Sequence, residues 1–304
     1  MKSRVDHRRS GQRRLGIGSG GGTSVRVVKT IAEMQSISRE LRMRGSVIGF
    51  VPTMGALHQG HLSLVRRARS ECDTVVASIF VNPLQFGPSE DFAKYPRTFE
   101  ADCISLKSEG VDVLFAPDVA EMYPNGSVTT VTVSEIGDRL DGASRPGHFI
   151  GVATVVAKLF HAVGPTRAYF GQKDAAQLAV LRQLIRDMNF DVELVGCAIV
   201  RDTDGLALSS RNKYLSETER KHALVLHQTL LELEQMIAKG ERRSTQLVRA
   251  GLEALNAESE IRLDYLAIVD ANILLPVSSA ETGTLVAVAA YVGSTRLIDN
   301  FVVA

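Results

Sequence analysis

The sequence has few cysteines and no long apolar run, and its charges almost balance. The three cysteines, Cys72, Cys103 and Cys197, are widely spaced and form no Cys-x-x-Cys pair. This pattern argues against a disulfide framework and a cysteine-built zinc site, and it is typical of a cytoplasmic protein. No uninterrupted apolar run reaches the roughly 18 residues of a membrane-spanning helix, so we expect no membrane partner.

The balance of charge gives no general argument for a nucleic-acid partner either. Lys and Arg number 35 and Asp and Glu number 34, which leaves a formal net charge of +1. Hydrophobic residues make up 45% and charged residues 23%, values typical of a globular protein and not of a disordered chain. At roughly 150 residues per domain, a chain of 304 residues predicts about two domains.

Several common catalytic motifs are also absent. No serine lies in a GxSxG turn, so the sequence does not favour a serine nucleophile on a hydrolase fold. A Walker A loop is missing. The glycines of residues 16–22 follow no predicted strand, so they do not form a dinucleotide-binding turn.

Residues 1–23 differ in composition from the rest of the chain. They carry six basic residues against one acid, Asp6, and then run into a Gly/Ser string. They lack the apolar core of a secretory signal, and the glycines give no amphipathic face for an organellar transit peptide. We predict a disordered tail. The alternative is an unspecific electrostatic arm for nucleic acid or phosphate.

Residues 24–204 alternate between strand-like and helix-like patterns, which predicts an α/β domain. The short apolar strands favour a Rossmann-like, doubly wound parallel sheet with helices on both faces. In such sheets ligands bind beyond the carboxyl ends of the strands. The expected strands are 47–53, 74–81, 111–116, 167–170 and 192–200. The expected helices are 60–70, 99–109, 149–163 and 175–188.

The pattern changes near residue 205, where we place a domain boundary. Ser216 and Glu219 form a capping box that opens a helix running to residue 239. A second helix over 244–257 and three strands over 261–269, 284–292 and 295–303 follow. Residues 205–304 are therefore predicted to form a smaller C-terminal α+β domain.

The loop PTMGALHQGH, residues 52–61, joins a predicted strand to a predicted helix. Gly55 and Gly60 let the backbone turn and approach a ligand closely. The positive end of the helix favours phosphate, and His58 and His61 lie one turn apart, where both can donate hydrogen bonds to a polyphosphate. The alternatives are a metal half-site, for which no third ligand is near, and a surface pair without a role.

Two further loops carry polar side chains at strand ends. Asn82 and Gln85 both donate and accept hydrogen bonds, as a hydroxylated substrate requires. The alternative is that the Asn-Pro and Gly-Pro pairs of this loop only mark turns. Lys173 precedes a helix that Asp174 would cap, with Gln177 about one turn later on the same side. A lysine there can reach a phosphate; the alternative is a solvated lysine beside a simple cap.

A fourth loop contains Ser209, Ser210 and Arg211, two hydroxyls and a guanidinium that would form a phosphate clamp. Ser-Ser-Arg is common by chance, so this loop alone says little. Four such loops at predicted carboxyl ends of strands together predict one site for a phosphate-bearing ligand.

These segments resemble the pantoate–β-alanine ligase family. PTMGALHQGH resembles its PTMGxLHxGH loop, a variant of the HIGH signature in a nucleotidyltransferase superfamily that includes class I aminoacyl-tRNA synthetases. SIFVNPLQF, RPGHFIGVATVVAKLF, YFGQKDAAQL and GLALSSRNKYLS follow in the family's order, and DYLAIVD and TRLIDN also fit. The resemblance covers roughly residues 25–304.

The resemblance implies a two-step, ATP-dependent reaction. ATP and pantoate would give pantoyl adenylate and pyrophosphate, and the amine of β-alanine would then release AMP and form pantothenate. Adenylation supplies the leaving group that a carboxylate lacks at neutral pH. The resemblance further implies Mg²⁺ bound with the nucleotide, mainly through phosphates and water, and a homodimer.

The resemblance also implies roles for individual residues. His58, His61 and Lys173 would be catalytic, with His61 as the family's proton donor. Gln85 and Gln177 would hold pantoate, and Asn82 would support Gln85. The ATP-binding set would be Met54, Gly55, Ala56, Leu57, His58, Gln59, Gly60, His61, Gly171, Gln172, Lys173, Asp174, Val200 (through its backbone, to adenine), Leu208, Ser209, Ser210 and Arg211.

Three positions depart from the family pattern. Leu208 stands where the family often has Met, a near-isosteric change. Gln59 and Gln172 stand where Glu is common, so an acid near the polyphosphate is lost, which we expect to alter affinity and not chemistry. Residues 1–23 lie outside the pattern.

Two other functions fit parts of the sequence. One is a nucleotidyltransferase that stops at nucleotide transfer; it has no need of the amide set Asn82, Gln85 and Gln177. The other is a binding protein whose basic tail contacts nucleic acid. The ligase interpretation predicts small-molecule partners and no nucleic acid.

Overall fold

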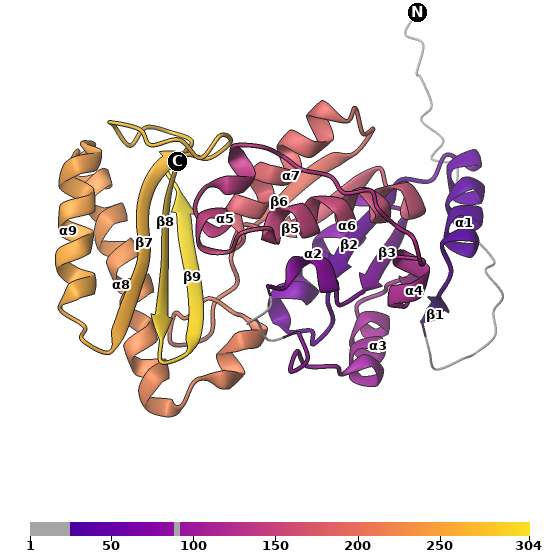
Figure 1. Cartoon of the computed structure of the whole chain (residues 1–304), viewed down its shortest axis with the longest axis horizontal. Coiled ribbons are helices and arrows are strands. Elements are labelled where there is room, and N and C mark those ends of the chain that lie inside the picture. The colour runs from indigo at the N-terminus through magenta and orange to yellow at the C-terminus, as the bar shows by residue number, and fades with distance from the viewer. Residues whose placement is uncertain (1–24, 88–91) are drawn as a thin grey trace, which may run out of the picture.

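Six parallel strands form the larger sheet in the computed structural model, which describes residues 25–87 and 92–304 (Figure 1). Their spatial order is β1-β4-β3-β2-β5-β6. The strands are β1 (Arg26–Val28), β2 (Ile48–Thr53), β3 (Thr74–Ile79), β4 (Val113–Phe115), β5 (Arg167–Gly171) and β6 (Glu193–Cys197). The predicted tail, residues 1–23, lies outside the described residues.

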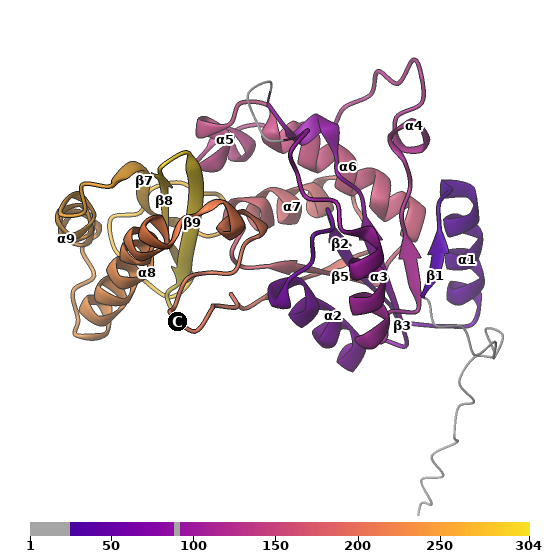
Figure 2. The same ribbon diagram turned by 90° about the horizontal axis from the view of Figure 1, so that it is seen from below.

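Helices cover both faces of this sheet, as the doubly wound prediction requires (Figure 2). Strand residues alternate between the faces: Phe50 and Val76 pack against α1, α6 and α7, whereas Val51 and Val75 pack against α2 and α3. The helices are α1 (Ile31–Met43), α2 (Gln59–Glu71), α3 (Phe99–Ser108), α4 (Val119–Met122), α5 (Asp141–Ser144), α6 (His148–Val163) and α7 (Ala175–Asp187).

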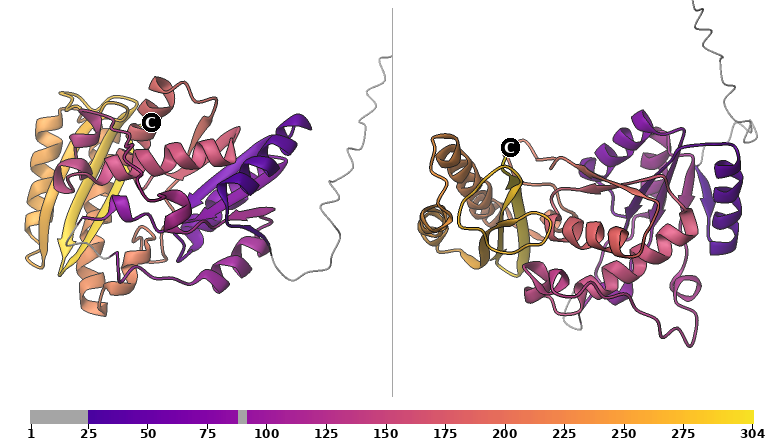
Figure 3. Two further views of the ribbon diagram at one scale, coloured as in Figure 1. Left: turned by 45° about the vertical axis from the view of Figure 1, so that its right-hand side comes forward. Right: turned by 90° about the horizontal axis from the view of Figure 1, so that it is seen from above.

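The C-terminal domain is a three-stranded antiparallel sheet in the order β7-β8-β9, with two helices on its outer face (Figure 3). Its elements are α8 (Glu217–Ala238), α9 (Ser244–Asn256), β7 (Ile261–Asp270), β8 (Thr284–Val292) and β9 (Thr295–Val302). Ser216 and Glu219 form the predicted capping box of α8.

Strand β8 contributes to two hydrophobic cores. Val286, Val288 and Ala290 pack with α8 and α9, whereas Leu285 and Ala287 on the opposite face join the core of the larger domain. The C-terminal sheet therefore packs directly on the larger domain. The boundary at residues 204 and 205 stays a prediction.

The α/β class and the expected strands and helices are confirmed, and two differences stand out. The pair β1 and α1 was not expected, although Thr30 and Glu33 give α1 a side-chain cap. Strand β6 ends at Cys197, three residues before the predicted end. Within the described ranges, no helix has the length and apolar character needed to span a membrane.

Candidate active site

The site lies where the strand order reverses. β2 and β5 are neighbours, but the chain continues from β2 to β3 on one side and from β5 to β6 on the other. The loops that follow β2 and β5 therefore run in opposite directions and leave a crevice between them. All four loops singled out in the sequence follow strands β3, β2, β5 and β6, which are adjacent in this sheet.

The turn after β2 is held by a carboxylate from another helix. Gly55 (φ +81°) and Ala56 (φ +50°) both have positive φ, which turns the backbone sharply. Asp102 of α3 accepts hydrogen bonds from the backbone N–H of Ala56 and Leu57, each at 2.9 Å, and from Thr98 Oγ1 at 3.1 Å. Asp102 is 3% exposed and was not singled out in the sequence.

The two histidines lie at the start of α2, with ring centroids 4.1 Å apart. His58 Nδ1 accepts from the backbone N–H of Gly60 at 3.2 Å, and His61 Nδ1 accepts from the backbone N–H of His58 at 3.3 Å. Because each Nδ1 is an acceptor, a neutral ring carries its proton on Nε2. The predicted placement of both rings on one side of the turn is confirmed.

Burial keeps both rings neutral. It lowers the pKa of His58 to about 3, with further lowering by His61 and Lys173. Burial also lowers the pKa of His61 to about 4, again with a contribution from Lys173. At neutral pH each ring therefore offers an N–H donor and no extra proton, and an adjacent polyphosphate would raise both pKa values.

We expect this pair to make the protein less stable as pH falls. An unfolded histidine binds a proton near pH 6.5, whereas His61 in the folded chain binds it only near 4, so stability decreases between these values. The loss is up to about 1.4 kcal/mol per pH unit for each histidine. The double variant His58→Asn/His61→Asn keeps an acceptor oxygen but does not titrate, so its urea-unfolding free energy should depend less on pH. An equal slope in both proteins would contradict the assignment.

Residues after β3 hold Gln85 in one orientation. Asn82 Nδ2 donates to Gln85 Oε1 at 3.1 Å and to Gly151 O at 3.0 Å, and Tyr123 Oη donates to Asn82 Oδ1 at 2.8 Å. Burial raises the pKa of Tyr123, so its hydroxyl stays a donor. Gly151 lets the loop after β3 approach α6 closely, because a Cβ at this position would lie 2.2 Å from the backbone oxygen of Leu84. The predicted contact of Asn82 with Gln85 is thus present.

Arg145 and His148, beside and at the start of α6, were not predicted as site residues. His148 Nδ1 lies 2.8 Å from Gln85 O, and Arg145 Nη1 lies 3.0 Å from His148 Nε2. Both occur in the family-like RPGHF segment, which was the signal that could have identified them.

The loops after β5 and β6 bring the basic groups to the crevice. Lys173 lies in the turn before α7. Arg211 lies in the short 3-10 helix Ser210–Tyr214. Ser209 caps this helix, and its hydroxyl oxygen accepts a hydrogen bond from the Arg211 backbone N–H at 3.3 Å. The expectation for Asp174 was partly wrong: it occupies the cap position of α7, but within the described chain its side chain makes no capping hydrogen bond. Its carboxylate is left beside the crevice instead.

Two adjoining cavities fill the crevice, one of about 240 Å³ and one of about 580 Å³. Seven residues line both: Arg145, His148, Lys173, Asp174, Gln177, Ser209 and Arg211. The smaller cavity is also lined by the predicted residues Met54, His58, Gly60, His61, Asn82, Gln85, Gly171, Val200, Leu208 and Ser210.

Five predicted ATP-binding residues are not in these walls, as far as the described residues show: Gly55, Ala56, Leu57, Gln59 and Gln172. The backbone N–H groups of Ala56 and Leu57 are taken by Asp102 and are not offered to a ligand. Gln59 accepts from Arg66 at 2.7 Å, and Gln172 bonds to Asn300 of the C-terminal domain. The Gln59 and Gln172 departures therefore lie outside the cavity wall.

Comparison with known proteins identifies a matching family and several similar proteins. A family model described as pantoate-beta-alanine ligase matches residues 26–302. A pantothenate synthetase from Acidobacterium capsulatum is 59% identical over 287 residues, covering 91% of this chain and 96% of that protein. The crystal structure of pantothenate synthetase from Thermus thermophilus has a TM-score of 0.86 at 52% identity, covering 92% of this chain and 99% of that one.

A more distant structure carries ligands. The pantoate-beta-alanine ligase of Francisella tularensis, described as complexed with beta-gamma ATP and beta-alanine, has a TM-score of 0.74 at 35% identity. The match covers 91% of this chain and 97% of that one.

Proposed function

Since the chain belongs to the pantoate–β-alanine ligase family and is an enzyme that forms pantothenate, we propose that it does so through a pantoyl-adenylate intermediate. The observation that carries this proposal is the meeting of four loops around one crevice, with His58, His61, Lys173 and Arg211 all lining it. Such a cluster of N–H donors and positive charge suits a triphosphate.

In this proposal ATP lies along the smaller cavity. Val200 and Leu208 would border adenine, while His58, His61, Lys173 and the Ser209–Arg211 clamp would hold the phosphates. The positive end of the α2 dipole lies at the same place, because His58, Gly60 and His61 at the start of this helix line the cavity. The relative from Francisella tularensis, whose description names beta-gamma ATP and beta-alanine, supports both as ligands.

Pantoate would lie between the two glutamines. Asn82 holds the carboxamide of Gln85 and His148 contacts its backbone carbonyl, so the side chain is positioned before a substrate arrives. Gln177 lines the cavity from α7. The two amides supply donors for a carboxylate and both donors and acceptors for hydroxyl groups, which matches a small hydroxy acid.

The proposed reaction has two steps. A carboxylate oxygen of pantoate attacks the α-phosphorus of ATP, and the bond from the α-phosphorus to the bridging oxygen breaks to release pyrophosphate. The amine of β-alanine then attacks the acyl carbon, AMP leaves, and the amine loses a proton. Neutral His58 and His61 donate through Nε2–H, and Lys173 and Arg211 balance the negative charge that develops on the phosphates.

The cavities offer few carboxylate ligands for Mg²⁺. Asp174 and Asp141 are the carboxylates that line the cavities in the described chain, and Asp141 is paired with Arg296 at 2.7 Å. One available carboxylate suits an ion held mainly by phosphates and water. When bound, the ion would neutralise phosphate charge.

Mass detection of pantothenate and AMP tests the proposal. We expect both products from ATP, pantoate and β-alanine, and pantoate-dependent exchange of labelled pyrophosphate into ATP when β-alanine is left out. A nucleotidyltransferase that stops after the first step would exchange label but release no AMP on addition of β-alanine. Product formation without pyrophosphate exchange would contradict the adenylate.

We infer a homodimer in the cytoplasm with small molecules as partners and neither nucleic acid nor membrane. The balanced charge of the chain supports the last two points, because a net charge of +1 gives no long-range attraction to a polyanion or an anionic lipid surface.

A further inference from the structure

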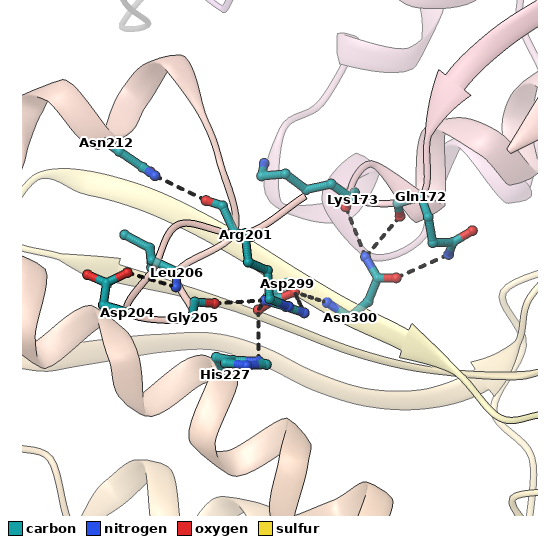
Figure 4. A network of polar contacts seen from close by, with 11 residues as sticks. Gln172, Lys173, Arg201, Asp204, Gly205, Leu206, Asn212, His227, Asp299 and Asn300 are labelled. Atoms are coloured by element: carbon teal, nitrogen blue, oxygen red, sulfur yellow. Dashed lines mark hydrogen bonds and ion pairs between the residues drawn. The ribbon is translucent and has the colours of Figure 1, made fainter. Parts of the chain in front are cut away.

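The loop that carries Lys173 is held from the C-terminal domain. Asn300 of β9 donates from Nδ2 to the carbonyl oxygens of Gln172 at 3.1 Å and Lys173 at 2.9 Å (Figure 4). Its Oδ1 accepts from Gln172 Nε2 at 3.1 Å. A carboxamide has two N–H donors and one oxygen, so one turn of chain uses all three groups. Asn300 is 3% exposed, so water does not easily replace these bonds.

We propose that Asn300 is a positioning residue for Lys173. Asn300 holds the main chain from which the lysine projects, and the lysine side chain runs away from Asn300 (Figure 4). Asn300 is not among the described residues that line either cavity, so it acts through the lysine and not on a substrate. The inference rests on the proposed role of Lys173 in binding the phosphates.

The chemistry of lysine explains why its anchoring matters. The ammonium is a point charge on a flexible four-carbon stem, and its reach is set by the position of its Cα. A shift of about 1 Å in a catalytic group can lower a rate about 100-fold. Gln172 N–H also donates to Cys197 O at 2.7 Å, so the turn is fixed to β6 on one side and to Asn300 on the other.

The preceding residue of β9 fixes the other basic loop. Asp299 binds Arg201 through both carboxylate oxygens, at 2.6 and 3.0 Å, and Arg201 also donates to Gly205 O at 3.2 Å (Figure 4). Successive strand residues point to opposite faces, so Asp299 and Asn300 reach two different loops. One strand therefore sets the separation between the Lys173 turn and the segment that leads to the Ser-Ser-Arg clamp.

Asn300 is not needed to keep the domains together. Arg296 of β9 forms a separate ion pair with Asp141 of α5, at 2.7 Å, and β8 shares the core of the larger domain. Loss of Asn300 should therefore release the Lys173 turn while the domains stay packed.

A double-mutant cycle tests this inference. Asn300→Asp keeps the size of the side chain but presents an oxygen to two carbonyl oxygens. We expect it to lower pantoate-dependent pyrophosphate exchange about 10- to 100-fold in the full-length enzyme. In the Lys173→Met background, the same change should lower the exchange rate no further, because the ammonium that Asn300 positions is already absent. Asn256→Asp, at the exposed end of α9, is the control and should leave the exchange rate unchanged in both backgrounds.

The outcomes distinguish the positioning role of Asn300 from the phosphate-binding role of Lys173. An equal fold-loss from Asn300→Asp in both backgrounds, or a normal rate for Asn300→Asp alone, would overturn the positioning role. A normal rate for Lys173→Met would instead overturn the proposed role of Lys173, and the positioning role with it. If Asn300→Asp does not fold, as judged by circular dichroism, Asn300→Ala removes the donors without adding charge and enters the same cycle.

Discussion

Replacing Lys173 by methionine should lower pantoate-dependent pyrophosphate exchange about 100- to 1,000-fold, the usual cost of losing one charge-stabilising donor. Lys173 lines both cavities, and in the described part of the chain no carboxylate forms an ion pair with its ammonium. Its charge also contributes to lowering the pKa of His58 and His61. The ammonium is thus available to a phosphate and not neutralised by a partner.

Methionine preserves much of the apolar length of lysine, so the fold should be kept. Lys221→Met, at an exposed position of α8, is the matched control and should exchange pyrophosphate at the normal rate. Lys173→Arg would test whether charge alone suffices, since the guanidinium is larger and planar. Near-normal exchange by Lys173→Met would exclude it from the phosphate site.

Replacing Asp102 by alanine should lower both stability and activity. The carboxylate is the acceptor for two backbone N–H groups, that of Ala56, which is buried, and that of Leu57, which is partly buried. Each unsatisfied N–H costs about 1–3 kcal/mol, so the free energy of unfolding should fall by about 2–6 kcal/mol. The turn at Gly55 and Ala56, with positive φ at both residues, would also lose its support, and with it the placement of the adjacent histidine pair.

Urea unfolding and pyrophosphate exchange, measured on the same samples, check this expectation. Glu100→Ala removes an exposed carboxylate from the same helix α3 and should change neither quantity appreciably. Asp102→Asn keeps one acceptor oxygen, so its loss of stability should lie between wild type and Asp102→Ala. Wild-type stability of Asp102→Ala would show that the turn does not depend on this carboxylate.

Much of the fold was predictable because its patterns are local. Apolar runs of strand length, helical spacing of Leu62, Val65 and Ala68, and the Ser216 capping box all lie within a few residues of one another. The short strand β1 gave no such pattern: it has three residues, and its first, Arg26, is exposed. The helix α1 did carry a usable signal, a Thr30 cap followed by Met34, Ile37 and Leu41 on one face.

The loops of the site were predictable for the same reason, but their supports were not. Asp102 lies 46 residues from Ala56, and Asn300 lies 127 residues from Lys173. Nothing in the local sequence distinguishes a carboxylate that holds a distant turn from one on an exposed helix. Polar side chains that bind a ligand recur in motifs, whereas those that bind backbone are recognised only once the chain has folded.

The hydrogen bonds between Asn300 of β9 and the Lys173 turn have a consequence for folding during synthesis. The turn leaves the ribosome 128 residues before the asparagine that secures Gln172. At about 5–20 residues per second, synthesis of that interval takes on the order of ten seconds. During this interval all six strands of the parallel sheet have been made, but the Lys173 turn still lacks its contacts with Asn300, so the proposed site should be completed only late in synthesis.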